Sequence, residues 1–156
     1  MPEKHQGDFA HEWVEFLNEV RVALPGVQIL FAFLLSVPFS DRFSHLGPLV
    51  RYVYMVSFLC TTGASAFLIA PSVYHRLHWR RDVGDKEQMF RTCNRLAIAG
   101  VTLLAVAMSA AVFLPAFIIF GTLAAAVTAS VVGGLIAWLW FGLPLTRRLR
   151  ESIPES

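Results

Sequence analysis

The longest stretch of this sequence without a charged residue runs from Leu96 to Pro144 and contains 49 residues. As one α-helix it would be about 73 Å long at 1.5 Å per residue, more than twice the roughly 30 Å hydrocarbon layer of a bilayer. The stretch therefore predicts two membrane-spanning helices folded back on each other. Pro115 and Gly121 interrupt its uniform apolar pattern, so we expect the turn between Leu114 and Gly121.

Composition extends this prediction to the whole chain. Hydrophobic residues make up 56% of the 156 residues, charged residues make up 15%, and the mean hydropathy is +0.57. Soluble domains carry about a quarter charged residues because their surface faces water. The apolar content also excludes a disordered chain, and two cysteines are too few for a disulfide scaffold. We therefore predict an integral membrane protein.

Two further apolar stretches precede the long one, and each is long enough to cross the bilayer. We expect an all-α fold, a transmembrane four-helix bundle in a single domain over residues 1–156. Its spans are predicted at about 22–39, 49–74, 96–114 and 121–143.

The placement of Lys and Arg predicts the orientation of the spans. With four passes, the N-terminus, the 75–95 loop and the C-terminus share one side, which holds eleven of the thirteen Lys and Arg residues. The other side holds Arg42 and Arg51. Both termini are therefore expected in the cytoplasm, with the chain in the cell membrane. Cys60 falls in a span and Cys93 in the reducing 75–95 loop, so both are expected as free thiols.

A further helix is predicted ahead of the first span, over about residues 8–21. Its apolar residues gather on one face and its acidic residues on another, as in an amphipathic interfacial helix lying on the membrane surface. An anionic leaflet attracts Lys and Arg, so the basic 75–95 loop is the expected partner of the acidic face. The apolar face comprises Phe9, Trp13, Phe16, Leu17, Val20 and Leu24, and the acidic face comprises Asp8, Glu12, Glu15 and Glu19.

Two polar features inside the spans each allow two interpretations. Pro25 removes a helical hydrogen bond close to Gln28, which favours either a polar site with exposed carbonyls or a simple bend in the chain. The second span carries a stripe of hydroxyls that either lines a hydrated path or bonds to nearby carbonyls within the packed bundle. The stripe consists of Tyr54, Ser57, Thr61, Ser65 and Ser72.

Small residues recur at every fourth position of the fourth span. They let helix backbones approach closely, which is a main source of attraction between helices in lipid. The repeat predicts a packing seam whose partner is a helix of the same chain or of a second copy. Its members are Gly121, Ala125, Ala129, Gly133 and Ala137.

The 75–95 loop is strongly basic. His75 and His78 have a spacing that two metal ligands can use, but no neighbouring residues complete a set, so no metal site is expected. Arginines at the membrane edge are expected to contact lipid phosphates. These residues are Arg76, Arg80, Arg81, Arg147 and Arg148.

A polar cluster is predicted on the cytoplasmic side. Glu15 and Glu19 lie at the membrane depth expected for Arg91 and Arg95, and charged residues at a membrane edge usually find such partners or extend to water. The candidate cluster consists of Glu15, Glu19, Arg21, Gln28, His75, Arg91, Asn94 and Arg95.

The string NEVRVALPGVQILFAFLLSVPFSDRF at residues 18–43, followed by IAPSVYHRLHWR at 69–80, resembles a bacterial family known as domain of unknown function 6328. The resemblance covers almost the whole chain. It implies that the chain is a small four-span membrane protein. Some members of the family carry the label sodium:proton antiporter, so the resemblance also implies that activity.

Two functions are expected from these observations. The first is a cation or proton transporter-type protein acting as an oligomer, and the alternative is a non-transporting accessory or structural subunit of a larger membrane complex. No nucleophile and base pair is visible, so the chain is not expected to be an enzyme or to hold a cofactor. The expected partners are the lipid bilayer and a homo-oligomer or larger complex. A net charge of +2 gives no reason to expect nucleic acid.

Overall fold

A computed structural model describes residues 3–41, 43–78 and 86–142. Four long helices dominate it: α1 (Glu3–Ser36), α2 (Pro48–His78), α3 (Lys86–Phe120) and α4 (Thr122–Ala137). Two short 3-10 helices, η1 (Val37–Phe39) and η2 (Phe43–His45), join α1 to α2, and a π-helical turn, η4 (Trp138–Gly142), follows α4. The described residues contain no strand.

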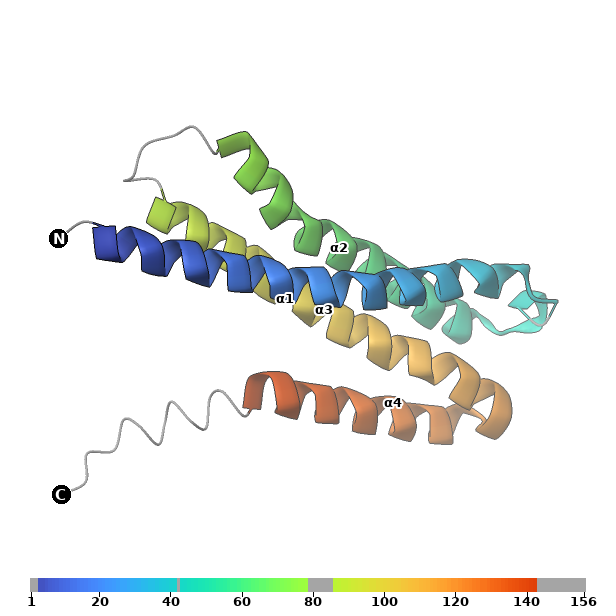
Figure 1. Cartoon of the computed structure of the whole chain (residues 1–156). Helices are drawn as coiled ribbons and strands as arrows, with labels where there is room; N and C mark the ends of the chain where they lie inside the picture. The colour runs from blue at the N-terminus through green and yellow to red at the C-terminus, as the bar shows by residue number, and fades with distance from the viewer. Residues whose placement is uncertain (1–2, 42, 79–85, 143–156) are drawn as a thin grey trace, which may run out of the picture.

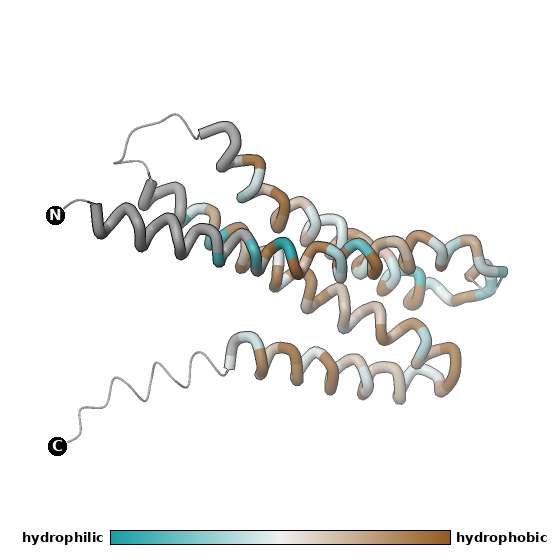
Figure 2. Tube along the Cα trace, viewed as in Figure 1, coloured by the Kyte–Doolittle hydropathy of each residue, from teal (hydrophilic) through white to brown (hydrophobic). Residues whose placement is uncertain are grey.

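All four long helices are long and apolar enough to cross a membrane, as predicted. The apolar segments are Val20–Phe39, Pro48–Val73, Arg91–Phe120 and Thr122–Trp140. Hydrophobic residues cover α4 and most of α3, whereas hydrophilic ones appear at the connection of α1 to α2, at the start of α3 and at points along α1 (Figure 2). The all-α membrane fold is therefore confirmed.

The first helix differs from the sequence prediction because it is continuous. Residues 8–21 are helical, but they form the N-terminal half of α1 and not a separate interfacial helix. Pro25 lies inside α1 and does not end it. Val20, Val27 and Leu34 follow one another at seven-residue spacing and are at most 5% exposed, so one face of α1 packs against the bundle over its whole span.

The turn between α3 and α4 is shorter than predicted. Helix α3 continues through Pro115 to Phe120, and the chain reverses at Gly121 alone. Gly121 has a φ of 83°, a conformation that suits glycine because it has no Cβ. Its N–H donates to the Phe117 carbonyl at 3.0 Å and its carbonyl accepts from the Ala125 N–H at 3.1 Å, so one residue ends α3 and begins α4.

Helices α1, α2 and α3 form one packed group, and α4 runs antiparallel along α3 (Figure 1). The connections α1–α2 and α3–α4 lie at one end of the bundle, which we call the turn end; the N-terminus lies at the other, the terminal end. One core cluster surrounds Leu34, Tyr54 and Leu114 near the turn end. A second surrounds Val27, Leu68 and Leu104 nearer the terminal end.

Candidate functional site

The hydroxyls of α2 that point into the bundle all donate to backbone carbonyls. Ser57 and Thr61 are fully buried. The Ser57 hydroxyl donates across to the Ala107 carbonyl of α3 at 2.9 Å, whereas Thr61 donates to the Ser57 carbonyl at 2.8 Å and Ser65 to that of Thr61 at 3.0 Å. Ser72 is exposed and lies outside this group. Of the two interpretations of the stripe, this geometry favours packing, because each buried donor is already occupied.

Tyr54 makes the hydrogen bond that joins α2 to α1. Its hydroxyl donates to the Leu34 carbonyl at 3.1 Å in a buried position. The residue four positions after Leu34 is Pro38, which has no N–H to offer that carbonyl. Tyr54 therefore supplies the donor that the helix itself lacks.

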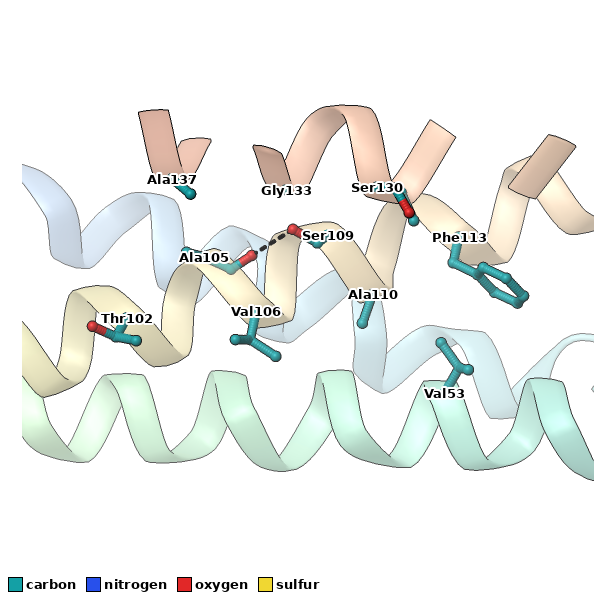
Figure 3. Close-up of a pocket in the computed structure, with 11 residues that line it drawn as sticks. Val53, Thr102, Ala105, Val106, Ser109, Ala110, Phe113, Ser130, Gly133 and Ala137 are labelled. Atoms are coloured by element: carbon teal, nitrogen blue, oxygen red, sulfur yellow. Dashed lines mark hydrogen bonds between the residues drawn. The ribbon is translucent and has the colours of Figure 1, made fainter. Parts of the chain in front are cut away.

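A groove lies between α3 and α4 and is closed on one side by Val53 of α2 (Figure 3). Its volume is about 500 Å³, within the usual range of ligand pockets. Alanines, valines, a phenylalanine and a glycine make up most of its wall, so it suits an apolar chain. The wall consists of Val53, Thr102, Ala105, Val106, Ser109, Ala110, Phe113, Ala129, Ser130, Gly133 and Ala137.

Three hydroxyls add limited polarity to this groove. Thr102 donates to the Ile98 carbonyl at 2.7 Å and Ser109 to the Ala105 carbonyl at 2.8 Å, so both are bonded within their own helix. Ser130 is exposed on α4. None of the lining side chains titrates, and the groove therefore offers no acid, base or metal ligand. Sequence reasoning missed this groove, although Thr102 and Ser109 stand seven residues apart on one helical face.

The small residues of α4 contact α3 of the same chain. Ala125 is fully buried and Ala129 packs against the core near the turn end. A Cβ on Gly133 would lie only 2.9 Å from the Ser109 hydroxyl oxygen, so the two helices approach closely there. Gly121 forms the turn, and Ala137 lies at the exposed edge of the groove.

The predicted polar cluster is only partly described. Glu15, Arg91, Asn94 and Arg95 are exposed near the terminal end, and Arg21 and Gln28 are exposed on α1. Glu15 and Arg91 each have interaction partners. The side chains of Glu19, His75 and Arg76 lie outside the described residues, as do Arg80, Arg81, Arg147 and Arg148. The Glu19–Arg95 ion pair therefore stays a prediction.

The two cysteines are free thiols, as expected. Cys60 is half-buried in α2, and Cys93 lies within α3 and is fully buried, so it belongs to a helix and not to the loop that the sequence suggested. Among the described residues, no three His, Cys, Asp or Glu side chains come together in a way that could hold a metal ion.

The four apolar helices and the apolar groove define this protein as a small multi-pass α-helical membrane protein. The chain belongs to a family of unknown function, DUF6328, whose family model matches residues 2–144. The family resemblance of the sequence is thereby confirmed. Comparisons with curated proteins and with solved structures found no match.

Proposed function

We propose that this chain is a non-transporting accessory or structural subunit of the bacterial inner membrane, with both termini in the cytoplasm. In this role its spans pack laterally against other membrane components, and it neither carries ions nor catalyses a reaction.

The bonding of the buried hydroxyls is the observation that carries this proposal. A transport path through a chain of this size needs polar groups that can exchange partners with the transported ion. The buried polar groups Ser57, Thr61 and Tyr54 instead donate to carbonyls at 2.8 to 3.1 Å and lie among apolar side chains. Such groups hold helices together.

A cation or proton transporter is the second candidate, and one observation favours it in an oligomeric form. Arg21 and Gln28 are exposed on the outer surface of α1 and do not face the other helices of the packed group. A polar route that uses them would run between copies of the chain, so this function requires an oligomer.

Purified protein in sealed vesicles separates these two functions. Vesicles containing a pH-sensitive dye receive a sodium or proton gradient, and the rate of internal pH change is measured. We expect the internal pH of the protein-containing vesicles to change at the same rate as that of protein-free vesicles. As a positive control, an added ionophore that exchanges sodium for protons should produce a fast response in both kinds of vesicle. Flotation of the protein with the vesicles shows that it is inserted.

Protein-dependent exchange above that of protein-free vesicles would overturn the accessory role. If the rate also rises with the square of the protein density, the transporting form is a dimer, and a steeper rise indicates a larger oligomer.

A further inference from the structure

Gln28 lies near the middle of the first span. The apolar segment runs from Val20 to Phe39, so Gln28 is about 12 Å from one end and about 16 Å from the other at 1.5 Å per residue. At that depth the surroundings are hydrocarbon, in which an amide without a hydrogen-bond partner is costly.

The side chain of Gln28 is exposed, and among the described residues it has no hydrogen-bond partner. Its amide can donate two hydrogen bonds and accept two. Lipid tails can satisfy none of these. The isolated chain therefore leaves a strong hydrogen-bonding group facing the interior of the bilayer.

The residues around Gln28 form a regular seam along α1. Arg21, Pro25, Gln28, Ala32 and Leu35 follow one another at spacings of four and three, and all are exposed. At about 100° per residue they fall within roughly 80° of one another on the helix. Spacings of four and three are those of the contact face of left-handed helix pairs, including helix pairs in membranes.

No other helix in the described part of the chain covers this seam. A different face of α1, with Val20, Val27 and Leu34, packs on α2 and α3. Helix α4 packs on α3, away from α1 (Figure 1). Ala32 is small, which favours close approach of another helix at this seam.

The chemistry of Gln28 selects a second copy of this chain as the partner. An amide is both donor and acceptor, so the same residue on both sides of a two-fold axis can form a reciprocal pair. The two copies are parallel because they share one orientation in the membrane. This places the two Arg21 side chains at the edge of the span, where water and headgroups weaken their repulsion.

We propose that this chain forms a parallel homodimer through the α1 seam, in which the two Gln28 amides hydrogen-bond to each other near the centre of the bilayer. The inference does not depend on the proposed function, since a dimer can serve either an accessory subunit or a transporter.

Cysteine crosslinking in membranes tests which face is buried in the dimer. In a background with Cys60→Ser and Cys93→Ala, Ala32→Cys places a thiol on the seam, and Val131→Cys places one on an α4 position that is 64% exposed. Mild oxidation should produce a disulfide-linked dimer from Ala32→Cys and much less from Val131→Cys. Equal crosslinking at both positions, or none at Ala32→Cys, would overturn the proposal.

Energy transfer between donor- and acceptor-labelled copies in vesicles tests the role of the amide. Gln28→Leu should weaken the dimerisation constant by about 3- to 20-fold, the range expected for interhelical hydrogen bonds in membranes. Ile29→Leu, at an adjacent position that is 72% exposed, serves as the control and should have little effect.

The melting temperature of the detergent-solubilised monomer should be the same for Gln28→Leu and the wild type, because Gln28 contacts no partner within the described chain. An unchanged dimerisation constant in Gln28→Leu would disprove the amide pair. A wild-type protein that stays monomeric at all densities in lipid would disprove the dimer, whatever the ion-flux assay shows.

Discussion

At the scale of single residues, hydroxyl donors hold the three-helix group together. Tyr54 joins α2 to α1 through the Leu34 carbonyl, and Ser57 joins α2 to α3 through the Ala107 carbonyl. The two acceptor carbonyls differ in whether their own helix also supplies a hydrogen-bond donor. The carbonyl of Leu34 has no helical donor because Pro38 follows it, whereas Ala107 lies within an uninterrupted part of α3. The Tyr54 bond therefore satisfies a carbonyl that would otherwise be buried without a partner.

Tyr54→Phe should destabilise the protein by about 1 kcal/mol, because it removes the donor and leaves the ring in place. Thermal unfolding in detergent measures the change. Tyr52→Phe is the matched control, since Tyr52 is 70% exposed on the same helix. Equal effects of the two substitutions would mean that the Leu34 carbonyl finds another donor.

At the scale of helices, the contact between α3 and α4 depends on one close approach. Gly133 faces the Ser109 hydroxyl, whereas the next residue, Gly134, has open space where its Cβ would lie. These adjacent glycines therefore separate the effect of packing from that of helix propensity, which favours alanine over glycine by up to about 1 kcal/mol at both positions.

Gly134→Ala should leave the melting temperature in detergent unchanged or raise it, and the melting temperature of Gly133→Ala should be lower than that of Gly134→Ala. The added methyl group pushes the Ser109 hydroxyl out of its 2.8 Å bond to the Ala105 carbonyl, at a cost of about 1 kcal/mol. Gly133→Leu should be worse, because it inserts a large side chain between two packed helices. The double variant Gly133→Ala with Ser109→Ala should recover part of the loss. Strict additivity of these two substitutions would show that the residues do not interact.

At the scale of the whole molecule, the α1–α2 and α3–α4 connections share the turn end of the bundle (Figure 1). The turn end holds the connection from α1 to α2, which is ordered by a hydrogen bond from the Arg51 guanidinium to the Ser44 carbonyl at 2.7 Å. Of the described residues, Arg91 and Arg95 lie near the terminal end, and the sequence predicts eleven of the thirteen Lys and Arg residues on the side of the termini. This asymmetry predicts that the terminal end faces the cytoplasm.

Single cysteines should label from opposite sides of the membrane. In a background without Cys60 and Cys93, Ser44→Cys at the turn end should react with an impermeant maleimide added to intact cells. Asn18→Cys, near the terminal end, should react only after the cells are opened. Both positions are exposed. Labelling of both from outside would contradict the orientation. Labelling of Asn18→Cys in intact cells, with Ser44→Cys labelled only after lysis, would reverse it.

The sequence by itself determined the number and approximate positions of the spans. The length of an apolar run, compared with the thickness of the bilayer, depends on composition along the chain and not on how the helices pack. The need for a turn between Leu96 and Pro144 followed from the same comparison. The stripe of hydroxyls on α2 and the small residues on α4 were also visible, because both follow helical spacing.

Only the tertiary structure decided which neighbour each of these faces meets. A helical wheel gives the relative angle of two residues on one helix, but not the angle at which that helix faces another. In the structure, the small residues of α4 face α3, and the Ser57 hydroxyl faces the Ala107 carbonyl. Gln28 faces away from the bundle. The sequence also did not predict that α3 continues through Pro115. A proline in a membrane helix costs one hydrogen bond, and the packing around it can offset that cost.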